Sequence, residues 1–146
     1  MQKITTFLAF NNQAEEAMNF YVSIFKNAKV LNRMSPGGVF MGGSFQIEGQ
    51  VFNVLNGGPH FTFSEGISLY VNCETQEEID ELWEKLSAGG QKQRCGWLKD
   101  KFGVSWQIIP PVLGKLLGDK DPKKSKRVMD AMLKMDKIII KTLEEA

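Results

Sequence analysis

The sequence predicts an α+β fold in which two βαβββ modules form a curved, mainly antiparallel sheet that is followed by a C-terminal helix. Three observations predict this fold: one helix-like motif occurs twice, a strand-like run precedes each copy, and a second motif repeats near the end of each half. We expect residues 1–58 and 59–112 to form the two modules and residues 113–146 a helical extension, all in one compact domain.

The first repeat pairs residues 15–21 (EEAMNFY) with residues 77–83 (EEIDELW). Both copies place apolar residues three and four positions apart, which is typical of an amphipathic helix. Asn12 and Thr75 each precede a glutamate by three positions, which is the spacing of a capping box. Gly89 follows the second copy and predicts the end of that helix.

Strand-like runs complete each half. Residues 4–10 and 67–71 precede the two helices, and residues 49–55 match residues 103–109 as the last strand of each half. The middle strands are expected at residues 30–34, 39–47 and 91–94, with a loop through Gly96. A helix that covers one face of a sheet leaves the other face free, so two halves side by side predict a shared concave face with a ligand pocket.

The last part of the chain has helix signals of its own. Pro110-Pro111 ends the sheet, because proline cannot continue a ladder, and Asp121-Pro122 begins a helix. A methionine-rich stripe then indicates either core or a dimer contact: Val128, Met129, Met132, Leu133 and Met135. Whether residues 137–146 continue this helix stays open.

Composition excludes several functions. Eighteen basic residues nearly balance seventeen acidic ones, so we expect no nucleic-acid partner and no anionic membrane surface. The basic run at residues 120–127 is interpreted as a solvated helix face. Two cysteines make no disulfide framework, and no apolar stretch approaches the ~20 residues that span a bilayer. A reducing cytoplasm is the expected location.

The duplication resembles the vicinal-oxygen-chelate (glyoxalase/bleomycin-resistance) superfamily, and more narrowly its PhnB-like, demethylubiquinone 3-methyltransferase-like family. This resemblance implies a glyoxalase-like fold and a homodimer. The segments that carry it span nearly the whole chain: Ala14–Ala17, Asn19–Tyr21, Asn56–Pro59, Phe61–Phe63, Ile67-Ser68, Cys95–Asp100, Phe102–Gln107 and Met129–Met135.

The resemblance also implies four sheet positions that hold a divalent ion in the metal enzymes of the superfamily. Counting back 14 residues from the helix motif places the first-strand positions at Thr6 and Ser68, and the last-strand positions are Asn53 and Gln107. Neutral hydroxyl and amide groups do not offset the desolvation of a dication. We therefore predict no metal and no cofactor, and a pocket for an uncharged or anionic small organic molecule.

Further pocket residues are predicted around these four. Tyr70 shares the face of Ser68, while Trp97 and Phe102 flank an expected loop at residues 99–101 and either stack on a flat ligand or cap the sheet. Asp100 is placed at the pocket as a hydrogen-bond acceptor, with a plain turn residue as the alternative. Cys95 is included, although no base stands beside it in the sequence.

Two residues are interpreted as structural, Cys73 as buried filler and Trp106 as packing under a helix.

Three functions remain in competition. The first is a metal-free binding or sequestering protein for a flat small molecule. The second is an enzyme, either a lyase or oxygenase with other metal ligands such as Glu48, His60 or Glu65, or a methyltransferase as the family label says. No glycine-rich turn follows residues 4–10, however, where S-adenosylmethionine would be expected to bind. The third is a dimeric interaction domain.

Overall fold

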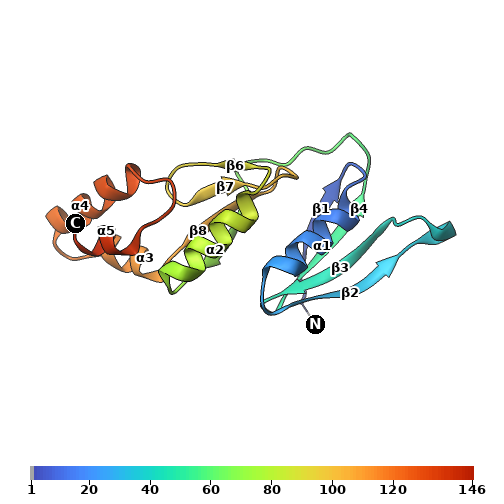
Figure 1. Cartoon of the computed structure of the whole chain (residues 1–146), viewed down its shortest axis with the longest axis horizontal. Coiled ribbons are helices and arrows are strands. Elements are labelled where there is room, and N and C mark those ends of the chain that lie inside the picture. Colours follow the sequence, from blue (N-terminus) through green and yellow to red (C-terminus); the bar gives the residue numbers. More distant parts are fainter. Residues whose placement is uncertain (1) are drawn as a thin grey trace. The chain divides into compact units, whose positions relative to one another are not determined.

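The computed structural model describes residues 2–146 and confirms the α+β architecture with its internal duplication (Figure 1). The chain divides into two compact units, Met1–Thr62 and Phe63–Ala146. The first unit contains β1 (Thr6–Phe10), α1 (Ala14–Ile24), β2 (Ala28–Met34), the short 3-10 helix η1 (Pro36–Gly38), β3 (Gly42–Ile47) and β4 (Gln50–Asn56). The second contains β5 (Leu69–Asn72), α2 (Gln76–Ser87), β6 (Gln91–Lys92), β7 (Trp97–Lys99), β8 (Ser105–Ile109) and three C-terminal helices.

Each module builds a four-stranded sheet with the same topology. The strand orders are β1-β4-β3-β2 and β5-β8-β7-β6, with the first and last strands of each module parallel and the other pairs antiparallel. Hydrogen bonding thus gives two four-stranded sheets, where the sequence predicted one curved sheet. In the register of the parallel pairs, Phe7 lies opposite Asn53 and Tyr70 lies opposite Gln107.

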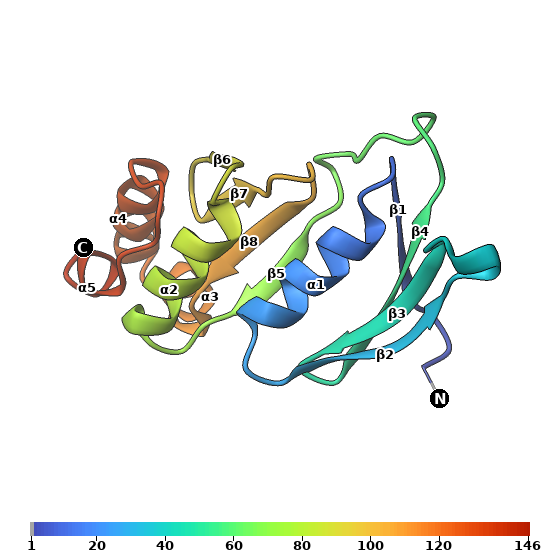
Figure 2. The same ribbon diagram turned by 45° about the vertical axis from the view of Figure 1, so that its right-hand side comes forward.

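One helix packs on one face of each sheet (Figure 2). In the first unit, Tyr21 of α1 stacks on Phe45 of β3 with ring centroids 5.9 Å apart, and Leu8 and Val54 are buried in the same layer. In the second unit, the buried residues of α2 and of its sheet are Ile79, Leu82, Trp83, Leu86, Leu98, Trp106 and Ile108. We call the side of each sheet that is turned away from the helix of its module the far face.

The two module helices begin differently. Thr75 caps α2 as predicted, because its hydroxyl accepts the backbone N–H of Glu78 at 3.2 Å. The predicted cap of α1 by Asn12 is wrong: Asn12 has a φ of 65°, and Gln13 takes the cap position without a side-chain bond. Asn56, at the end of β4, instead accepts the N–H of Ala14 at 2.8 Å, so a residue distant in the sequence caps the helix.

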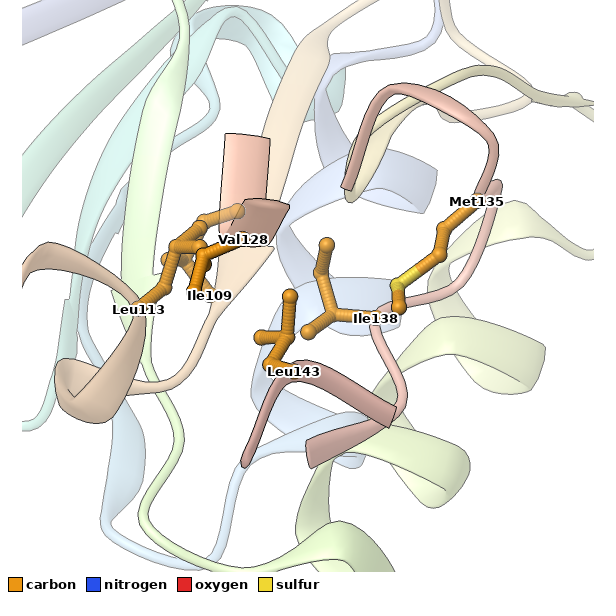
Figure 3. Packing of buried hydrophobic residues seen from close by; sticks show 6 residues of the cluster. All are labelled: Ile109, Leu113, Val128, Met135, Ile138 and Leu143. Atoms are coloured by element: carbon orange, nitrogen blue, oxygen red, sulfur yellow. The ribbon is translucent and has the colours of Figure 1, made fainter. Parts of the chain in front are cut away.

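The C-terminal extension forms three helices, where the sequence predicted one: α3 (Pro111–Leu117), α4 (Pro122–Leu133) and α5 (Ile140–Glu144). The predicted start of α4 is confirmed, because Asp121 accepts the N–H of Lys123 at 3.0 Å. Side chains from all three helices converge on the end of β8 in one buried cluster (Figure 3): Ile109, Leu113, Val128, Met135, Ile138 and Leu143. Only part of the predicted stripe is core, since Met129 and Leu133 are exposed.

The segment after α4 leaves the helix because other parts of the second unit bind its backbone. The carbonyls of Met135 and Asp136 accept the N–H groups of Cys95 and Gly96 at 2.9 and 2.7 Å. The Gln76 side chain donates to the carbonyl of Ile138 and accepts the N–H of Ile140, at 2.9 and 2.8 Å. Within residues 2–146, every helix falls short of the length and apolarity needed to cross a bilayer.

Cys73 is fully buried, as predicted. Burial first, and then the nearby Glu78 carboxylate, raises the pKa of its thiol from 9.0 to about 12. Because the folded pKa lies above the unfolded one, the contribution of Cys73 to folding stability is fully present below pH 9.0. It is lost as the pH rises towards 12.

We therefore expect Cys73 to resist alkylation in the native protein. In a Cys95→Ser variant, which leaves Cys73 as the single thiol, a thiol reagent at pH 8 should react only as fast as the protein unfolds. Stopped-flow labelling with and without urea measures this rate. Fast labelling without urea would contradict the burial of the thiol.

Candidate functional site

A row of three side chains crosses the far face of the second sheet. Gln107 on β8 lies opposite Tyr70 on β5 and opposite Trp97 on β7. Residues opposite each other in a ladder share a face, so the carboxamide stands between two aromatic side chains. The Gln107 amide nitrogen donates to the Ser68 hydroxyl at 2.9 Å, which sets the direction of the amide. We call Ser68, Tyr70, Trp97 and Gln107 the carboxamide row.

The first sheet carries a corresponding row. Asn53 on β4 lies opposite Phe7 on β1 and Ser44 on β3, and the Ser44 hydroxyl donates to Asn32 at 3.1 Å. Phe7 is 57% exposed and its counterpart Tyr70 is 53% exposed. Large exposed aromatic side chains beside a carboxamide are therefore a property of both modules. The pairing of Asn53 with Gln107 as last-strand positions is the one that the sequence repeat predicted.

Thr6 does not join Asn53. It lies opposite Phe52, on the face with Leu8 that α1 covers, whereas Asn53 points to the far face. Thr5, directly before β1, precedes Phe7 by two residues, as Ser68 precedes Tyr70 in the second module. Counting back from the helix missed this by one residue, because Phe7 precedes Phe20 by 13 residues in the first module, whereas its counterpart Tyr70 precedes Leu82 by 12 in the second.

Trp97 reaches the carboxamide row because it lies in a strand. The sequence placed Trp97 beside a loop at residues 99–101, but Trp97–Lys99 form β7. Phe102 follows in the turn between β7 and β8 and is 9% exposed, with the Lys101 ammonium 5.3 Å from the centre of its ring. Phe102 therefore lies outside the strands that carry Trp97 and Gln107.

Asp100 is directed into the turn rather than onto the far face. Its Oδ1 accepts the N–H groups of Phe102 and Val104 at 2.9 and 3.0 Å, and its Oδ2 accepts the Trp106 indole N–H at 2.9 Å. The residue is 2% exposed. Its carboxylate therefore organises the β7–β8 connection, and the structural role predicted for Trp106 is confirmed.

Cys95 faces the C-terminal extension. It has a φ of 60°, its N–H donates to the carbonyl of Met135, and its sulfur lies 3.6 Å from the carbonyl of Met132. These contacts set the thiol apart from the carboxamide row, although Cys95 precedes Trp97 by only two residues.

The chemistry of the far faces is that of neutral donors and acceptors. Thr5, Asn53, Ser68 and Gln107 supply hydroxyl and amide groups, which do not suit a divalent ion. Among residues 2–146, no three His, Cys, Asp or Glu side chains gather in a way that could hold one.

The other metal ligands that the sequence offered lie elsewhere. Glu48 is in the β3–β4 turn, His60 is exposed in the segment that follows β4, and Glu65 pairs with Lys99.

Sequence reasoning missed Phe7, Ser44 and Lys99 on the far faces. The missing information was the pairing register, which decides which residues of neighbouring strands stand side by side. Tyr70, which was expected at the site, has a raised pKa because burial disfavours its phenolate. The Tyr70 hydroxyl thus remains a neutral donor for a bound molecule.

Comparison with known proteins gives consistent relationships. Residues 2–109 match the model of a family described as 3-demethylubiquinone-9 3-methyltransferase. A Bacillus cereus structure, described as a PhnB protein and a 3-demethylubiquinone-9 3-methyltransferase, is 40% identical with a TM-score of 0.68; the match covers 75% of this chain and 99% of that one. No curated protein sequence matches the chain.

Two more distant structures share the fold. A Pseudomonas aeruginosa protein is 19% identical with a TM-score of 0.67, over 75% of this chain and 98% of its own. The fosfomycin resistance protein FosX of Listeria monocytogenes, described in complex with Mn(II) and sulfate, is 16% identical with a TM-score of 0.56, over 80% and 96%.

Proposed function

This chain belongs to the 3-demethylubiquinone-9 3-methyltransferase (PhnB-like) family of the vicinal-oxygen-chelate fold, and from that premise we propose that it binds a flat small organic molecule without a metal ion. One observation carries the proposal: the Gln107 carboxamide stands between Tyr70 and Trp97 on the far face of its sheet. Aromatic side chains offer stacking surfaces, and a carboxamide both donates and accepts hydrogen bonds.

The side chains at the four sheet positions do not favour a bound metal ion. FosX has the same fold and is described with Mn(II). Here Asn53 and Gln107 offer neutral oxygens, and Gln107 already engages Ser68. Desolvating a dication needs negative ligands that these positions do not supply. Neutral polar groups beside aromatic rings suit an organic ligand instead.

The family description names methyl transfer, a reaction that uses S-adenosylmethionine. Sites for nucleotide-like cofactors commonly use a parallel sheet with a glycine-rich turn after its first strand. Each sheet here has a single parallel pair, and Asn11, Asn12 and Gln13 connect β1 to α1. These residues do not fit that cofactor.

A thermal-shift screen tests the proposal. Among flat aromatic metabolites and antibiotics, we expect at least one to raise the melting temperature, because a ligand at 100 times its Kd stabilises the folded state by about 2.7 kcal/mol. Trp97→Ala should abolish the rise, and Met129→Ala, a change on the exposed side of α4, should keep it. Absence of any stabilising compound, or an unchanged rise in Trp97→Ala, would refute the proposal.

The homodimer and the cytoplasmic location stay predictions. Light scattering of the purified chain tests the first, and cell fractionation tests the second.

A further inference from the structure

The charged residues of the strands in both sheets are all basic. Among the strand residues that the structure describes, there are four cations and no Asp or Glu: Lys29, Arg33, Lys92 and Lys99. Strands that lack acidic residues on both faces cannot neutralise these cations by themselves. Arg33, Lys92 and Lys99 each have a carboxylate partner from outside the strands, whereas Lys29, opposite Gln46 on β3, is exposed to water.

The two cations on the helix-covered faces have partners within the fold. Arg33 of β2 lies 3.5 Å from the Glu15 carboxylate of α1, and Lys92 of β6 lies 2.8 Å from the Glu84 carboxylate of α2. The helix of each module thus supplies the counter-charge for its own side of the sheet.

Lys99 lies on the far face beside the carboxamide row. It stands opposite Ser105 on β8, while its neighbour Leu98 points to the α2 side and is fully buried. Lys99 follows Trp97 by two residues on one strand, so their Cα atoms lie about 7 Å apart on one face. An ammonium group and an indole ring at this spacing match an aromatic molecule that bears an acidic substituent.

The present partner of Lys99 comes from outside the strands. Glu65, in the segment before β5, accepts a hydrogen bond from the Lys99 ammonium, and its side chain is 66% exposed against 30% for Lys99. This hydrogen bond, and then the charge of Lys99, lower the pKa of Glu65 and keep its carboxylate ionised. An ion pair with so exposed a partner contributes little to stability, so another anion can replace Glu65 at small cost.

We propose that Lys99 is the anion subsite of the carboxamide row, so that the ligand is a flat aromatic acid whose carboxylate, sulfonate or phosphonate takes the place of Glu65 on the Lys99 ammonium. This inference rests on the function proposed above and narrows its ligand class. The aromatic part of the ligand lies against Trp97 and Tyr70, and Gln107 bonds its polar edge. Glu65 holds the ammonium in place until the acid binds.

Two fluorescent probes separate the charge from the ring. The anionic probe 1-anilinonaphthalene-8-sulfonate and the uncharged N-phenyl-1-naphthylamine share their ring system and differ by the sulfonate. We expect Lys99→Met to weaken binding of the anionic probe about tenfold, the value of a charge-assisted hydrogen bond, and to change binding of the neutral probe less than about twofold. Glu65→Gln should tighten binding of the anionic probe by about threefold, because its competitor is gone.

Further variants serve as controls for the probe-binding measurements. Lys92→Met removes a cation from the helix-covered side and should leave both probes unchanged, while Lys99→Arg keeps the charge and should keep the anionic probe bound. Trp97→Ala should weaken both probes. Circular dichroism melting of each variant confirms that it is folded.

The outcomes distinguish the two claims. Equal effects of Lys99→Met on both probes, or equal effects of Lys92→Met and Lys99→Met on the anionic probe, overturn the anion subsite. In that case Trp97-dependent binding of both probes leaves the proposed function standing. If neither probe binds, the anion subsite is overturned, and the thermal-shift screen decides the proposed function. If Trp97→Ala changes binding of neither probe, the carboxamide row is not the binding surface and both claims fail.

Discussion

Replacing Asp100 with alanine is expected to lower the free energy of unfolding by about 4 kcal/mol, because it leaves three donors in a buried turn without their acceptor. The carboxylate bonds the N–H groups of Phe102 and Val104 and the indole of Trp106, all within 2.9–3.0 Å. Hydrogen bonds to charged groups contribute about 1.5–3 kcal/mol each and do not add fully when they share one acceptor.

Urea unfolding followed by fluorescence measures the effect. Asp130→Ala is the matched control, because Asp130 lies on the surface of α4 and its carboxylate is 52% exposed beside Lys126; this change should cost less than about 0.5 kcal/mol. Trp106→Phe removes a single donor and should cost an intermediate amount. A cost for Asp100→Ala as small as that of the control would show that the turn does not depend on this carboxylate.

Gly96→Ala is expected to destabilise the protein by about 3 kcal/mol. Gly96 has a φ of +82°, and a Cβ atom there would lie 2.6 Å from Cδ1 of Ile109 and 3.0 Å from both the Ile108 carbonyl and Cγ1 of Ile138. The left-handed conformation costs an L-residue about 1–2 kcal/mol, and overpacking of this kind costs a further 1–3 kcal/mol or so.

Gly49→Ala separates these two costs. Gly49, in the turn between β3 and β4, has nearly the same φ of +81° but nothing within 4 Å of an added Cβ. It should therefore show the conformational cost alone, about 1 kcal/mol. Equal losses in the two variants would mean that Ile109 and Ile138 move aside easily for an added methyl group at residue 96.

Gly96 matters for the site because its backbone hydrogen bonds connect three parts of the second unit. Its N–H donates to the Asp136 carbonyl and its own carbonyl accepts the N–H of Ile108, at 2.7 and 2.8 Å. Trp97 follows immediately. The helical extension after residue 109 lies beyond the residues matched by the family model, yet through Gly96 it supports the strand that carries Trp97.

The sequence alone determined the duplicated module, the helix starts at Thr75 and Asp121, and the equivalence of Asn53 with Gln107. These features follow from local signals: apolar periodicity, capping residues and the spacing of repeats. Such signals depend on neighbours within a few residues, so they can be interpreted without knowledge of the fold.

Only the tertiary structure decided which side chains share the far face. Thr6 and Thr5 differ by one position, and in a pleated strand one position exchanges the two faces of the sheet. Trp97 and Lys99 required the pairing of β7 with β8, and Asp100 required the approach of Trp106. Pairing between strands and burial of a carboxylate are set by distant parts of the chain, which is the physical reason that local sequence patterns did not reveal them.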